Sequence, residues 1–155
     1  MNTRRYAETL VTRARANTDA LLTKLRQELR KVGDPVKAAA MQAYMKSAMP
    51  FHGVQTPLLR QVCRKILVEV SFASATLWRK QVLHLWRSAR FREERYAALY
   101  LSGDKRARTF QTPAAMKMYQ ELIGHGEHAR SFWRTWLSLR LQRCLACEDR
   151  IRSLR

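Results

Sequence analysis

The sequence has few of the residues that break or cross-link a chain. Its 155 residues include only five Gly, four Pro and three Cys. So little Gly and Pro excludes collagen-like and low-complexity classes. An odd number of Cys fits a reducing cytoplasm better than a disulfide scaffold. No apolar run approaches the roughly 20 residues that span a bilayer, and no apolar segment follows the basic N-terminus. We therefore expect a cytoplasmic protein with no membrane partner.

Acidic residues are scarce as well. Twelve Asp or Glu stand against thirty Lys or Arg, a formal net charge of +18, while 46% of the residues are hydrophobic. The hydrophobic share supports a folded core and argues against a disordered basic tail. The charge favours an anionic partner, most often nucleic acid and sometimes an anionic membrane. A solvated basic surface without a partner is the alternative.

The spacing of apolar residues is helical almost throughout. Stripes predict helices over 21–32, 38–49, 58–70, 77–86, 91–100, 116–123 and 132–145. Thr56-Pro57 and Thr112-Pro113 each read as an N-cap followed by the first helical residue, and Pro35 is placed to open a helix after Gly33-Asp34. Helices of about 12–15 residues with short breaks predict one all-α domain over residues 1–155, built of antiparallel pairs stacked as a HEAT-like α-solenoid. A compact bundle is the alternative.

The basic residues are spread over several of these helices. Residues 60–108 alone carry twelve bases and four acids. A solenoid could align them on one concave face, where each base that neutralises a phosphate makes binding salt-dependent. The bases concerned are Arg60, Arg64, Lys65, Arg79, Lys80, Arg87, Arg90, Arg92 and Arg95.

The most distinctive segment runs from Tyr44 to Pro57. It contains Tyr-Met-Lys and then Phe-His-Gly-Val-Gln-Thr-Pro, followed by a basic helix with Arg60 and Arg64. The segment resembles the DNA alkylation repair family of AlkD type, in which Tyr-Met-Lys precedes a Phe-x-Gly-Ile-Gln-Thr-Pro turn and a basic helix. Further similarity at 85–86, 92–99 and 118–123 extends the resemblance over about residues 20–123.

The resemblance implies a HEAT-like solenoid that grips duplex DNA and hydrolyses the N-glycosidic bond of N3- or N7-alkylated purines, with no metal or organic cofactor. By position, Tyr44 matches the lesion-side Tyr, Gln55 and Thr56 match the DNA-contacting loop, and Arg60 and Arg64 match the basic helix. The residues alone leave plainer interpretations open. Tyr44 could be a half-buried core aromatic, Gln55 a turn residue and Thr56 a simple N-cap.

The sequence departs from the resemblance where the chemistry should be. Ser131-Phe132-Trp133-Arg134 stands where the family pattern has Ser-Trp-Trp-Asp, whose Asp is catalytic. Trp133 matches as a lesion-binding residue, but Arg134 replaces the Asp. A cation there repels a cationic lesion and cannot stabilise an oxocarbenium ion. The nearby Glu127 is not expected to replace it. We therefore predict that glycosylase activity is lost.

Residues 130–155 look like a divergent tail. They hold seven Arg but no Lys or Gly, and the chain is shorter than the family pattern implies. A truncated protein with a change of reading frame near Arg134 is a hypothesis that the nucleotide sequence of the gene tests. The competing function classes are a non-catalytic basic helical module that binds nucleic acid and a domain that needs another subunit.

Four other features have plain interpretations. A lone Cys144-x-x-Cys147 lacks the second ligand pair of a metal site. Trp78 and Trp86, eight residues apart, are expected in the core. His52 is expected to be an exposed loop residue. Glu93-Glu94 is expected to be a helix face that pairs with Arg90.

Overall fold

The structure, a computed structural model, describes residues 3–124 of the chain, and every regular element in that part is helical. The all-α prediction is confirmed. The elements are α1 (Thr3–Val32), α2 (Pro35–Met45), α3 (Thr56–Leu67), α4 (Ala75–Ser88), α5 (Arg92–Ser102), the 3₁₀ helices η1 (Lys105–Phe110) and η2 (Pro113–Ala115), and α6 (Met116–Gly124). The expected helix at 132–145, with Trp133 and Arg134, and the Cys144–Cys147 pair lie outside the described residues.

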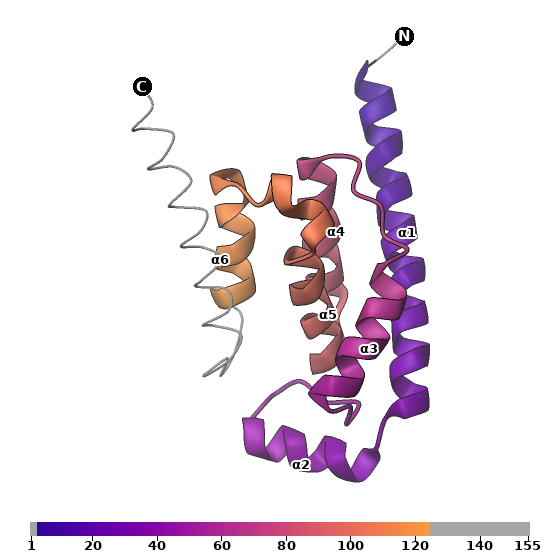
Figure 1. The fold of residues 1–155 in the computed structure, drawn as a ribbon, viewed down its shortest axis with the longest axis vertical. Coiled ribbons are helices and arrows are strands. Elements are labelled where there is room, and N and C mark those ends of the chain that lie inside the picture. Colours follow the sequence, from indigo (N-terminus) through magenta and orange to yellow (C-terminus); the bar gives the residue numbers. More distant parts are fainter. Residues whose placement is uncertain (1–2, 125–155) are drawn as a thin grey trace.

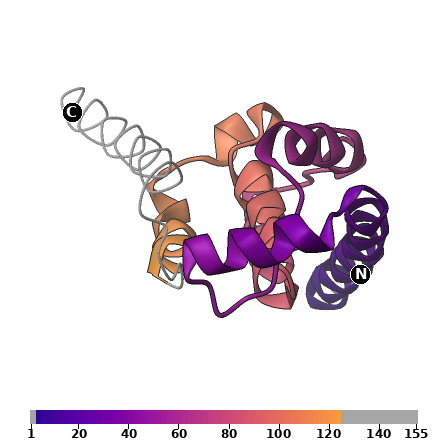
Figure 2. The same cartoon turned by 90° about the horizontal axis from the view of Figure 1, so that it is seen from below.

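Successive long helices run antiparallel. In Figure 1 the chain descends α1, rises along α3, descends α4, rises along α5 and descends α6. α1 packs on α3 and α4, α4 packs on α5, and α6 follows on the far side of α4. This sequential stacking is consistent with a solenoid-like fold. α2 is the exception, because it lies across the end of the other helices (Figure 2).

Leucine and tryptophan side chains form the core between these helices. Leu25, Leu29, Ile66 and Leu85 are fully buried. Trp78 is 0% exposed and its indole N–H donates to the Leu101 carbonyl at 3.3 Å. The core positions predicted for Trp78 and Trp86 are confirmed.

Two helix lengths differ from the sequence-based expectation. α1 has 30 residues, far beyond the expected 12–15, because no Gly or Pro interrupts it ahead of its buried stripe. α3 ends at Leu67, although its apolar stripe continues to Val70. The Arg106 guanidinium donates to the carbonyl oxygens of Leu67, Val68 and Val70 at 2.8, 3.0 and 3.0 Å. A residue distant in sequence therefore supplies hydrogen-bond donors to the carbonyl groups at the end of this helix.

α2 is held at its ends rather than along its length. The Asp34 carboxylate accepts from the amides of Val36 and Lys37 at 3.0 and 3.1 Å, so the start predicted at Gly33-Asp34-Pro35 is confirmed. At the other end Lys46 takes a left-handed conformation with φ 47°. Between them no residue is buried.

None of the described helices is long and apolar enough to cross a membrane.

Candidate nucleic-acid interface

A shallow groove of about 590 Å³ separates α2 from the start of α3. Its lining residues are Lys37, Ala40, Met41, Gln55, Thr56 and Pro57. Tyr44 lies on the same face of α2, since residues three and four apart are neighbours on a helix. Its side chain is 86% exposed, so the half-buried core interpretation of Tyr44 is wrong. Three of the predicted contact residues, Tyr44, Gln55 and Thr56, therefore gather around this α2–α3 groove.

The outer face of α3 continues from the groove. Thr56, Arg60 and Arg64 recur at four-residue spacing and all three are exposed, so they form one stripe with steps of about 6 Å along the helix axis. Arg60 lies beside the Tyr100 hydroxyl of α5: burial raises the pKa of Tyr100, and the guanidinium partly offsets this. Arg64 forms no ion pair within the described part of the chain. The five described candidate residues thus lie along one surface.

The start of α3 differs from the prediction at Thr56. Gln55 is the N-cap, in an extended conformation with ψ 153°, and Thr56 is already helical. No side chain caps the helix, and Pro57 occupies its second position. The N-cap role expected of Thr56 is therefore wrong, and the residue lines the groove instead.

A buried carboxylate holds the loop that leads into α3. Glu93, in the first turn of α5, accepts the backbone amides of His52, Gly53 and Val54 at 3.0, 3.0 and 3.2 Å. Its side chain is 0% exposed. Consecutive amides that converge on one anion form a nest. Here the anion is part of the protein itself, and we call this arrangement the Glu93 nest.

Glycine is required at the centre of the nest. Gly53 has φ +79°, and a Cβ built on it would lie 2.0 Å from the Asp34 carbonyl oxygen. The same loop accepts the Asp34 amide on the His52 carbonyl at 3.1 Å. The loop is therefore wedged between the start of α5 and the turn that joins α1 to α2.

The neighbouring carboxylate, Glu94, ties α1 to α5. It accepts from Arg26 Nε at 2.8 Å and Nη2 at 3.1 Å, and from the Arg90 amide at 2.7 Å. Burial alone would raise the pKa of Glu94, but contacts with His52, the Arg26 guanidinium and the Arg90 amide outweigh it and lower the pKa to about 2. Glu94 is therefore a permanently ionised structural group near neutral pH.

His52 completes the cluster. Its Nε2 lies 3.5 Å from Glu94 Oε1, a long contact without the geometry of a good hydrogen bond. Its ring stacks on Phe91 with centroids 3.9 Å apart. At 8% exposure His52 is not the exposed loop residue that we expected.

The salt-bridge face with Arg90 predicted for Glu93 and Glu94 is also wrong. Both are fully buried, and Arg90 contributes its backbone amide to Glu94. The sequence signal was ambiguous, because two acids in a first helical turn read equally well as surface residues. Only the tertiary fold shows that they face inward.

Several bases expected on a concave phosphate-binding face have internal roles. Arg92 is 5% exposed. Arg87 forms two hydrogen bonds with Glu121, at 2.7 and 2.6 Å. The Arg95 guanidinium lies 4.8 Å from the centre of the Trp86 ring. Placing Arg92 on that face was therefore wrong, whereas the Arg87 side chain stays 62% exposed beside Glu121.

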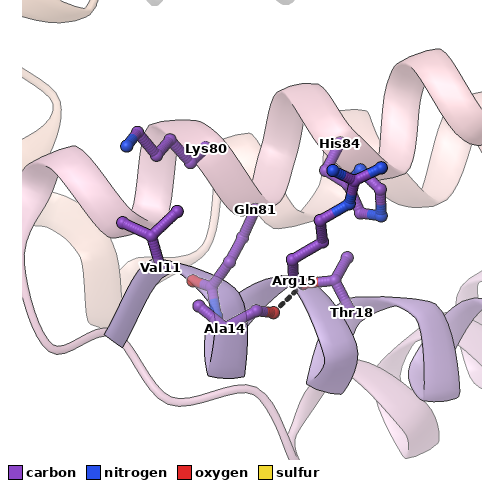
Figure 3. Close-up of a pocket in the computed structure, with 7 residues that line it drawn as sticks. All are labelled: Val11, Ala14, Arg15, Thr18, Lys80, Gln81 and His84. Atoms are coloured by element: carbon purple, nitrogen blue, oxygen red, sulfur yellow. Dashed lines mark hydrogen bonds between the residues drawn. The ribbon is translucent and has the colours of Figure 1, made fainter. Parts of the chain in front are cut away.

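A separate pocket of about 160 Å³ lies between α1 and α4 (Figure 3). Its lining residues are Val11, Ala14, Arg15, Thr18, Lys80, Gln81 and His84. The Thr18 hydroxyl donates to the Ala14 carbonyl at 2.8 Å, and His84 Nε2 lies 2.6 Å from Asp19 Oδ1. Lys80, one of the bases expected to contact phosphates, lines this pocket, but the groove residues Tyr44, Gln55 and Thr56 do not.

Comparison with protein families identifies the class of protein. Residues 25–131 match the model of a family described as DNA alkylation repair enzyme, and the chain belongs to that family. Its role is therefore in DNA alkylation repair, with DNA as the partner that the family indicates. Trp133 and Arg134 lie beyond the matched residues. A search of curated proteins finds no match. Within the described residues, no group of three or more His, Cys, Asp or Glu could hold a metal ion.

Proposed function

We propose that this protein binds duplex DNA, in the manner of an AlkD-type HEAT-like solenoid, through the α2–α3 groove and the outer face of α3. The observation that carries the proposal is the placement of Tyr44, Gln55, Thr56, Arg60 and Arg64 along one exposed surface. Cations at one-turn spacing suit a phosphate backbone. An exposed tyrosine can stack on an unpaired base or on a cationic purine.

We further propose that the chain does not excise alkylated bases. Glycosidic hydrolysis needs a carboxylate that can stabilise an oxocarbenium-like sugar and position water. In the described part of the chain, every Asp and Glu from Asp19 to Glu121 already has a hydrogen-bond or ion-pair partner. Glu93 and Glu94 are buried as well. By the resemblance, Arg134 stands where the family pattern has its catalytic Asp.

Fluorescence anisotropy with a labelled duplex tests the binding proposal. The double variant Arg60→Ala/Arg64→Ala should weaken binding and lower the slope of log K against log salt by about 1.8, because each phosphate contact contributes about 0.9. The control Arg13→Ala/Arg30→Ala removes the same charge from two exposed residues of α1, away from the groove and from α3. If this control lowers the slope as much as the α3 variant does, binding is not localised on α3.

A glycosylase assay tests the second part of the proposal. Duplex DNA that carries 7-methylguanine or 3-methyladenine should release no free base above the rate without protein. Release of the methylated base that disappears in Trp133→Ala or Glu127→Gln would show that the chain is an active glycosylase.

A non-catalytic basic module that binds nucleic acid through charge alone is the second candidate. The spread of its bases over several helices favours this function. It predicts equal affinity for alkylated and unmodified duplexes, and no effect of Tyr44→Ala. A preference for the alkylated duplex that Tyr44→Ala abolishes would favour a lesion-recognising repair protein.

A further inference from the structure

The Glu93 nest adjoins the proposed DNA-binding surface without belonging to it. Glu93 is buried and contacts the amides of residues 52–54. Gln55 and Thr56 follow immediately and are exposed at the groove. The loop therefore turns its first amides inward and its next two side chains outward.

We infer that Glu93 is a positioning residue for DNA binding. Its carboxylate gathers the amides of His52, Gly53 and Val54, and this sets the direction in which Gln55 and Thr56 leave the loop. The inference rests on the proposed function. Glu93 itself touches no DNA, because its side chain is 0% exposed.

The nest needs a carboxylate rather than a polar side chain in general. Both oxygens accept: Oε2 takes the His52 amide, and Oε1 takes those of Gly53 and Val54. Glutamine would turn an NH₂ group toward at least one of these donors. A donor that faces a donor leaves a buried amide unsatisfied, which is costly. The loop is then expected to move away from residue 93, because its amides lose their shared acceptor.

The sign of the effect on DNA affinity separates positioning from simple charge. Glu93→Gln raises the net charge by one, which by itself strengthens binding to a polyanion. Glu69→Gln makes the same change at an exposed carboxylate that pairs with Lys24, so it is the matched control. Positioning predicts that Glu93→Gln binds duplex about tenfold more weakly than Glu69→Gln, a difference of about 1.4 kcal/mol. The salt slope should stay unchanged, because the bases on α3 are intact.

A combined variant distinguishes positioning of Gln55 and Thr56 from a general loss of stability, because only positioning makes the effect of Glu93→Gln depend on these two side chains. In a Gln55→Ala/Thr56→Ala background, Glu93→Gln should cause no further loss of affinity. If the full tenfold loss persists in that background, Glu93 acts elsewhere and the inference fails. Equal affinities of Glu93→Gln and Glu69→Gln in the otherwise wild-type chain overturn it as well.

Glu93→Asp keeps the test decisive if Glu93→Gln does not fold. The shorter carboxylate keeps its charge but cannot reach all three amides. A folded Glu93→Asp protein with weaker duplex binding and faster hydrogen exchange at residues 52–54 supports the inference, and wild-type affinity contradicts it. If the wild-type protein does not bind duplex, or Arg60→Ala/Arg64→Ala has no effect, the proposed function fails first. If duplex binding depends on Arg60 and Arg64 but not on Glu93, only the inference about Glu93 fails and the proposed function is retained.

Discussion

Helix α2 and the first turn of α5 reverse the usual relation between polarity and burial. α2 is largely apolar, yet none of its residues is buried, and Val36 and Tyr44 are 80% and 86% exposed. α5 opens with Arg92, Glu93 and Glu94, and all three are buried. The difference follows from partners: the α5 carboxylates find amides and a guanidinium, whereas α2 lies across the end of the stack with little to pack against (Figure 2). The buried carboxylates of α5 therefore fix the loop and helices that lie beside the proposed interface.

The largest expected effect on stability comes from removing a buried carboxylate of α5. Glu94→Ala leaves Arg26 and the Arg90 amide without their shared partner. Removing one member of a buried ion pair costs about 3–5 kcal/mol, so the free energy of unfolding in urea should fall by about that amount. The control Glu69→Ala removes an exposed pair and should cost less than about 1 kcal/mol. Similar losses in the two variants would contradict the structural role of Glu94.

Gly53→Ala should be the next most disruptive change. The added methyl group meets the Asp34 carbonyl oxygen, and the residue must keep a positive φ. Overpacking and left-handed strain together cost about 2–4 kcal/mol, measurable by thermal or urea unfolding. The matched control Gly103→Ala, at a helix end with φ −102°, needs no left-handed conformation. A Gly53→Ala protein as stable as Gly103→Ala would show that the loop is not wedged.

The pH dependence of the free energy of unfolding tests the same buried carboxylate, Glu94. The folded-state pKa of Glu94 is about 2, below its ordinary value of 4.5. The stabilisation from this group is therefore present above about pH 4.5 and is lost as the pH falls toward 2, with a total on the order of 3 kcal/mol. Glu94→Gln, which does not titrate, should flatten the loss between these pH values. If the wild type and Glu94→Gln lose stability in parallel over that range, other carboxylates account for the acid sensitivity.

The smallest expected effect lies on α2. Val36→Ala and Tyr44→Ala remove exposed side chains, so each should change the free energy of unfolding by no more than about 0.5 kcal/mol. Only Tyr44→Ala should reduce affinity for alkylated duplex DNA, because the tyrosine ring can stack on a base or a cationic purine and the valine side chain cannot. A loss of stability in Tyr44→Ala above that limit would mean that the ring packs against the protein.

The helices themselves were predictable from local patterns. The apolar stripes located all six α-helices, and Gly33-Asp34-Pro35 correctly marked the start of α2. The boundaries at Leu67 and Thr56 were missed, because the first depends on Arg106 from a distant segment and the second on how the loop enters α3. The similarity to a DNA alkylation repair family was also readable from the sequence and is confirmed over residues 25–131.

The sequence by itself thus determined the helical class, the family and the basic character of this protein, because these depend on residue periodicity, motif spacing and composition. The tertiary structure decided which charges face solvent. Arg92, Glu93 and Glu94 read as surface residues, yet they are buried because amides and a guanidinium from other segments meet them there. Whether a charged side chain faces inward depends on partners distant in the chain, and these become neighbours only when the helices pack.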